Sequence, residues 1–151
     1  MRSGAARPSV RLAVLSPYQD MDKILAHLNK LNTRIQNRGK DNFLPHYEGF
    51  ERVYRRTLSV PTKEQRDICI GYNANAVLKM APAEFLAFMK RGIEHFSLHD
   101  SDFDILVIYI PKNFASFRTA SVISPDFNLH DALKLYATEK GIKLQLIEEN
   151  Q

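Results

Sequence analysis

Residues 103–149, FDILVIYIPKNFASFRTASVISPDFNLHDALKLYATEKGIKLQLIEE, carry the pattern that decides the fold. They begin with an apolar run, 103–111, of the kind that forms a strand buried on both faces in the middle of a parallel sheet. A polar segment follows, then a helical pattern, then a second apolar strand at 142–149. This order predicts two parallel strands joined by a helical crossover.

The helix between these strands has clear start and stop signals. Asn128 belongs to the residue types that cap helix N-termini, and Asp131 three positions later completes a pattern close to a capping box. Gly141 is expected to end the helix. The apolar positions recur at helical spacing: Leu129, Leu133, Tyr136 and Ala137.

The sequence before residue 103 repeats the alternation of strand and helix. Apolar runs predict strands at 9–17 and 67–73, and the run 52–61 predicts a strand at an edge of the sheet. An amphipathic helix is expected from Met21 to about Arg38, with Asp20 as its cap. Because a strand, a helix and further strands alternate, a parallel sheet is expected.

A second amphipathic helix is expected to begin at Pro82, which suits a first helical turn. Its apolar positions are Phe85, Leu86, Met89, Ile93 and Phe96. The segment before it, 74–81, shows no clear period. We therefore predict an α/β, Rossmann-like three-layer fold with a mostly parallel central sheet, forming a single domain over 9–151 after a flexible leader at 1–8.

Composition narrows the class of protein. The chain has 151 residues, of which 44% are hydrophobic and 25% charged, which suits one globular domain. The net charge of +4 suggests an anionic partner. The single cysteine, Cys69, excludes an internal disulfide framework and favours a cytoplasmic setting. No apolar run approaches the ~20 residues of a membrane helix, so no membrane partner is expected.

Two cations lie at the start of the helix that Asn128 caps. His130 and Lys134 are four residues apart, so they share one face of the helix. The helix dipole disfavours cations at this end, whereas an anion there would be favoured by the dipole, the free N–H groups and both side chains. Gln145 lies inside an apolar strand and needs partners for its amide. These residues predict a site for a terminal phosphate.

Other interpretations of the same residues stay open. Asp131 could form a surface ion pair with Lys134, and Gln145 could bond a neighbouring main-chain group. Three arginines could contact a nucleic-acid backbone or form a solvated surface: Arg52, Arg55 and Arg56.

A histidine cluster lies after the second predicted helix. His95, His99 and Asp100 are close in sequence, but no further ligand has suitable spacing, so no metal site is expected.

The stretch FDILVIYIP, the segment after it and FNLHDALKLYATEKGIKLQLI resemble the MID domain of prokaryotic Argonaute proteins. The signature of that family is an aromatic residue or histidine, a lysine four positions on, and a glutamine after the helix. It occurs here as His130, Lys134 and Gln145. RLAVLSP and YEGFERVYRRTLSVP resemble the opening of short Argonautes, which begin directly at MID.

The resemblance implies a binding module and not an enzyme. It would anchor the 5′-phosphate and first base of a guide strand for guided recognition of invading DNA. RNA is the expected guide, and DNA is the alternative. His130 would stack on the first base and contact the phosphate, which Lys134 and Gln145 would bind. The segment 112–126 would sense the first base, with Lys112 and Arg118 as the candidate contacts.

One part of the family's pocket is not in this sequence. In the family a further lysine, and often a divalent cation such as Mg²⁺, comes from the start of a PIWI domain, whereas this sequence stops at Gln151. Lys143, on the same strand face as Gln145, could partly substitute. The implied partners are a guide strand, a PIWI domain in the full-length protein and a separate effector-domain protein.

Two other classes of function stay open on the sequence alone. The first is a small α/β enzyme or binding domain for a phosphorylated metabolite, although the sequence has no glycine-rich phosphate loop and no paired carboxylates at a suggestive spacing. The second is a pure protein-interaction module. Neither the first-base preference nor the oligomeric state follows from the sequence.

Overall fold

The computed structural model describes residues 9–38, 57–114 and 128–149, except the side chains of 33–38. Five strands form one sheet in the order β2-β1-β4-β5, and β3 also pairs with β1. Every pair described is parallel. The strands are β1 Val10–Pro17, β2 Leu58–Ser59, β3 Cys69–Tyr72, β4 Ile105–Ile110 and β5 Lys143–Glu148.

The pairing of β1 with β4 forms the centre of the sheet. Leu12 of β1 is in register with Ile105 of β4, and the pairing continues to Leu15 and Ile108. On its other edge, β1 pairs with β2 near its start and with β3 near its end. All six residues of β4 are buried, as predicted for a strand covered on both faces.

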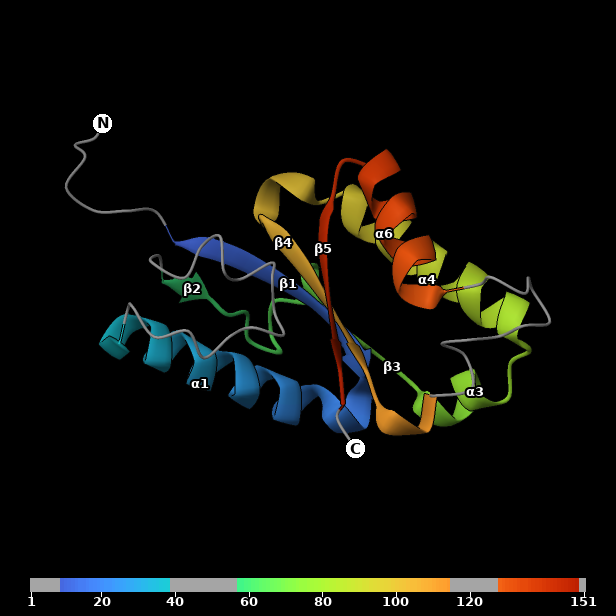
Figure 1. Cartoon of the computed structure of the whole chain (residues 1–151), viewed down its shortest axis with the longest axis horizontal. Coiled ribbons are helices and arrows are strands. Elements are labelled where there is room, and N and C mark those ends of the chain that lie inside the picture. The colour runs from blue at the N-terminus through green and yellow to red at the C-terminus, as the bar shows by residue number, and fades with distance from the viewer. Residues whose placement is uncertain (1–8, 39–56, 115–127, 150–151) are drawn as a thin grey trace.

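Helices cover both faces of the sheet (Figure 1). One face packs against α1 (Met21–Arg38), and the other packs against α3 (Ala74–Leu78), α4 (Pro82–Ser97) and α6 (Leu129–Glu139). Three 3₁₀ turns lie at the ends of strands: η1 Tyr18–Asp20, η2 Asp100–Asp102 and η3 Lys112–Phe114. This is the three-layer α/β fold that the sequence predicts.

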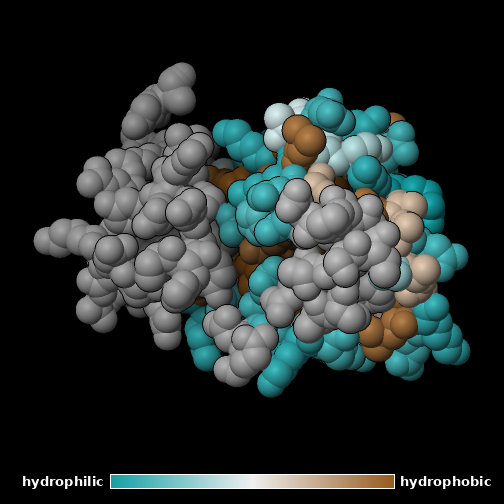
Figure 2. Space-filling view, turned by 45° about the vertical axis from the view of Figure 1, so that its right-hand side comes forward, coloured by the Kyte–Doolittle hydropathy of each residue, from teal (hydrophilic) through white to brown (hydrophobic). Residues whose placement is uncertain are grey.

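The pleat of each strand divides the buried residues between two cores. In β1, Leu12 and Val14 pack on the α1 side, whereas Ala13 and Leu15 pack under α4 and α6. The larger core contains most of the buried aromatic rings: Phe85, Phe96, Phe103 and Phe114. The described surface is largely hydrophilic, with separate hydrophobic areas (Figure 2). Within the described residues, no helix has the length and apolar character needed to cross a membrane.

The signals at the ends of α6 act as predicted. The side chain of Asn128 accepts a hydrogen bond from the N–H of Asp131 at 3.1 Å. Gly141 has a φ of 76°, a backbone conformation that favours glycine and stops the helix. Both ends of this helix are therefore fixed by local sequence.

The other predicted strands and helices are present, but two details differ. In the described part of the predicted strand at 52–61, only Leu58–Ser59 is strand, and Asp20, the expected cap of α1, is the last residue of the turn η1 that leads directly into α1. One further helix is also present. Helix α3 was not predicted, because its five residues are too few to show a period. The residue that marks the start of α3 is Asn73, whose side chain accepts a hydrogen bond from the N–H of Ala76 at 3.2 Å. The predicted leader at 1–8 lies outside the described residues, as do the arginines at 52–56.

Replacing Asn128 with alanine should remove one hydrogen bond from the start of α6. We expect the free energy of unfolding to fall by about 1 kcal/mol, the usual cost of losing an N-cap side chain. Urea denaturation would measure the change. Asn75→Ala is the matched control, because Asn75 is exposed and caps no helix. An equal effect of the two substitutions would contradict the assigned cap.

Candidate functional site

The N-terminus of α6 points towards the carboxyl edge of the sheet. Helix α6 connects β4 to the parallel strand β5, so it must run opposite to both strands (Figure 1). In open α/β sheets, ligands bind at this edge. The first turn of α6 is therefore in the right place for a ligand site.

Two backbone donors at this helix end lack a partner within 9–38, 57–114 and 128–149, the part of the chain that the structure describes. The Asn128 side chain accepts a hydrogen bond from the N–H of Asp131, and the Asn128 carbonyl accepts one from the N–H of Ala132. The N–H groups of Leu129 and His130 have no acceptor among the described residues. Unsatisfied N–H groups at a helix start carry partial positive charge and attract anions.

His130 and Lys134 lie beside these donors, on one flank of α6. The opposite flank faces α4, where the ammonium of Lys90 lies 5.4 Å from the centroid of the Tyr136 ring. Helical periodicity turns His130 and Lys134 away from α4. The side chain of His130 is 43% exposed, and Lys134 is half-buried.

The alternative ion pair between Asp131 and Lys134 is not formed. Asp131 instead approaches its neighbour His130, with 3.9 Å between the carboxylate oxygen and Nδ1. Among the described residues, Lys134 has no acidic partner within salt-bridge distance. Its ammonium is therefore available for an anion at the start of α6.

Gln145 does not join this pair. It is paired in register with Val107, which belongs to the core on the α1 side, whereas Leu144 and Leu146 belong to the core under α6. The side chain of Gln145 therefore lies on the face of the sheet opposite α6. It is buried, and its Nε2 donates to the carbonyl of Leu146 at 3.2 Å. Gln145 thus forms the hydrogen bond to a neighbouring main-chain group that was the alternative to phosphate binding.

Lys143 lies at the other edge of the sheet. It is the first residue of β5, at the amino end, and it lines a pocket of about 720 Å³. The N-terminus of α6 is at the carboxyl edge, so the structure does not bring Lys143 close to it. The expected role of Lys143 as a substitute lysine therefore has no geometric basis at this helix terminus.

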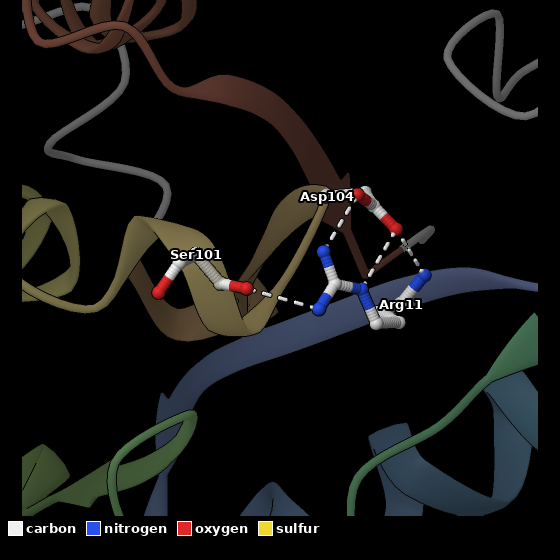
Figure 3. Close-up of polar contacts among 3 residues, drawn as sticks. All are labelled: Arg11, Ser101 and Asp104. Atoms are coloured by element: carbon white, nitrogen blue, oxygen red, sulfur yellow. Dashed lines mark hydrogen bonds and ion pairs between the residues drawn. The ribbon is translucent and has the colours of Figure 1, made fainter.

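A salt bridge forms one wall of the pocket that contains Lys143. The guanidinium of Arg11 binds both carboxylate oxygens of Asp104, each at 3.2 Å, and donates to the carbonyl of Ser101 at 2.9 Å (Figure 3). Asp104 also accepts the backbone N–H of Arg11 at 2.8 Å. This pairing raises the pKa of Arg11. Arg11 therefore links the start of β1 to the turn before β4.

Three residues are expected to contact the first base: His130, Lys112 and Arg118. Of these, His130 and Lys112 are described, and Arg118 lies outside the described residues. Lys112 is exposed at the carboxyl edge, in the turn η3. Its backbone N–H donates to Glu149 at 2.9 Å. The side chain is free to approach a ligand at this edge, while the backbone is fixed.

A second cluster at the carboxyl edge was not predicted. Lys23 in the first turn of α1 forms an ion pair with Glu149 at 3.2 Å, next to the ring of Tyr109 in β4. Burial raises the pKa of Asp20 nearby. Tyr109 and Glu149 lie in or just after the end of a strand, and Asp20 and Lys23 lie in the turn and the helix that follow β1. The sequence does not show that they meet, because Lys23 and Glu149 are 126 positions apart.

No metal site is present among the described residues, since no three His, Cys, Asp or Glu side chains come together there. The ring centroids of His95 and His99 are 5.4 Å apart, and Nδ1 of His99 lies 3.7 Å from a carboxylate oxygen of Asp102.

A comparison with models of known protein families and a comparison with curated proteins both give no match.

Replacing Glu149 with glutamine should destabilise the protein in a pH-dependent way. The backbone N–H of Lys112, and then Lys23, lower the pKa of Glu149 below its ordinary value of 4.5. The folded protein therefore favours the ionised carboxylate, which stabilises the fold at pH values above 4.5. This contribution is lost as the pH falls through the folded-state pKa of Glu149.

Urea denaturation of both proteins at neutral pH and well below pH 4.5 measures the difference. We expect Glu149→Gln to lower the free energy of unfolding at neutral pH and to have a smaller effect in acid. A difference that stays constant with pH would show that the contacts of Glu149 do not stabilise the ionised form.

Proposed function

We propose that this chain anchors the 5′-phosphate of a guide strand at the N-terminus of α6, as the MID domains of prokaryotic Argonautes do. The observation that carries the proposal is that the N–H groups of Leu129 and His130, and the nearby ammonium of Lys134, have no partner among the described residues. The resemblance of the 127–146 sequence to those domains supports the same assignment.

Each group at this helix end has a distinct role in the proposal. The two N–H groups donate hydrogen bonds to the phosphate oxygens, the helix dipole favours the negative charge there, and the ammonium of Lys134 balances that charge. The ring of His130 is half exposed and can stack on the first base, as aromatic rings do in RNA-binding proteins. The site thus distinguishes a phosphorylated 5′ end from an unphosphorylated one.

The proposed pocket contains fewer side chains than the sequence resemblance implies. Gln145 and Lys143 are left out, because one lies across the sheet and the other at its amino edge. Lys112 and Arg118 remain proposed contacts for the first base. A lysine and Mg²⁺ from a PIWI domain would complete the charge balance around the phosphate.

The biological role that we propose follows from the same resemblance. The chain would act in the cytoplasm as a non-enzymatic guide-binding module, with RNA as the proposed guide, in a prokaryotic defence system that recognises invading DNA. A PIWI domain would contribute the rest of the guide channel. A separate effector-domain protein would respond to the guided recognition.

Replacing Lys134 with alanine should weaken the binding of 5′-phosphorylated oligonucleotides selectively. A charged hydrogen bond contributes about 1.5–3 kcal/mol, which corresponds to a loss of about 10- to 150-fold in affinity. Matched 5′-phosphate and 5′-hydroxyl oligonucleotides, titrated with and without Mg²⁺, would measure this loss.

Lys140→Ala is the control, since Lys140 carries the same charge at the opposite end of α6, near Glu94. Equal weakening for the two oligonucleotides, or by the two substitutions, would overturn the phosphate assignment. Binding and turnover of a mononucleotide would instead favour the enzyme alternative.

Replacing His130 with alanine should remove a stacking surface for the first base. Stacking on an aromatic ring contributes about 1–3 kcal/mol per base. We expect His130→Phe to retain most of the affinity that His130→Ala loses. An oligonucleotide with an abasic first position should bind the two variants equally, and unequal binding would show that the ring acts on another part of the strand.

A further inference from the structure

The carboxyl ends of β1 and β4 meet at the point where the connections of the sheet change direction. The chain leaves β1 to form α1 on one face, whereas it leaves β4 through η3 towards the opposite face. Such a switch point leaves a crevice between the two connections, which is where open α/β sheets bind ligands. In Figure 1 the start of α1, the turn η3 and the end of β5 gather at the lower edge of the sheet.

A carboxylate from the chain itself occupies this position. Each oxygen of Glu149 has one donor: Oε1 accepts the backbone N–H of Lys112 at 2.9 Å, and Oε2 accepts from the ammonium of Lys23 at 3.2 Å. The N–H of Glu149 in turn donates to the carbonyl of Ile110 at 2.9 Å. The donors come from α1 and from the turn after β4, so they form a site for an anion between two connections.

A third donor beside this carboxylate is unused. Tyr109 is only 4% exposed, and its hydroxyl has no hydrogen-bond partner among the described residues. The Lys23 ammonium is 5.6 Å from the centroid of the Tyr109 ring, and the hydroxyl is close enough to raise the pKa of Lys23 and lower that of Glu149. A buried hydroxyl without a partner is costly, so it calls for an explanation.

We propose that Lys23, Tyr109 and the N–H of Lys112 form a second phosphate-binding site, in which Glu149 occupies the place of the phosphate. Both carboxylate oxygens lie in one plane, and here neither accepts a hydrogen bond from the Tyr109 hydroxyl, although each oxygen could accept a second donor. The oxygens of a phosphate group point in tetrahedral directions, so a phosphate in the same place can also give the Tyr109 hydroxyl an acceptor. The site uses neither His130 nor Lys134 and is independent of the site at α6.

The charges around the site make Glu149 a competitor of the ligand. Its side chain is 32% exposed, so it can move into solvent when an anion enters. The carboxylate of Asp20 is near enough to influence Tyr109 and adds a second negative charge. Weak binding is expected while both carboxylates are present, and removing either charge should strengthen it.

The test is a titration with inorganic phosphate, followed by the NMR signals of the Lys112 amide and the Tyr109 ring. Glu149→Gln should bind about tenfold more tightly than the unmodified chain, because a charged competitor for two donors is removed. Asp20→Asn should also tighten binding, which provides a second variant if Glu149→Gln does not fold. Adding Lys23→Met to Glu149→Gln should abolish the response, and adding Tyr109→Phe should weaken it.

The control is Lys30→Met in the Glu149→Gln background, since Lys30 is an exposed lysine of the same helix. It should leave the phosphate response of the Lys112 amide and the Tyr109 ring unchanged. A parallel titration with a 5′-phosphorylated oligonucleotide distinguishes a nucleotide phosphate from free phosphate. Equal affinity of the unmodified chain and both carboxylate variants, or equal loss with Lys23→Met and Lys30→Met, would overturn the proposal.

Discussion

The parallel pairing of β1 with β4 is the constraint on which the rest of the structure depends. Both strands are buried on both faces, so each face must be covered before their apolar side chains leave water. Covering two faces with crossover helices fixes α1 on one side and α4 and α6 on the other. Which side chains can meet is then decided by which face and which edge of the sheet each one occupies.

This division by face and edge separates residues that are close in sequence. Lys134 and Gln145 are eleven positions apart, yet the sheet lies between their side chains. Lys23 and Glu149 are 126 positions apart, yet they form an ion pair at the carboxyl edge. The carboxyl edge therefore holds two separate groups of donors for which we propose anion binding, one at α6 and one between β1 and β4.

Local signals made most of the fold predictable from the sequence. The apolar run of β4, the cap at Asn128 and the stop at Gly141 act within a few residues, so their structural effects follow directly from the sequence. The site was only partly predictable. Gln145 was expected beside Lys134, but the face that it occupies depends on strand register, which a helix–strand spacing does not determine. The hydrogen bonds of Glu149 with Lys23 and Lys112 join segments that are far apart in the sequence, so no local sequence pattern predicts them.

The central claim is that a 5′-phosphate binds the first turn of α6, and the backbone amides there report on it directly. In an NMR titration with matched oligonucleotides, the amide signals of Leu129 and His130 should shift with the 5′-phosphorylated strand and remain nearly unchanged with the 5′-hydroxyl strand. Equal shifts with both strands, or shifts confined to other parts of the chain, would contradict the account.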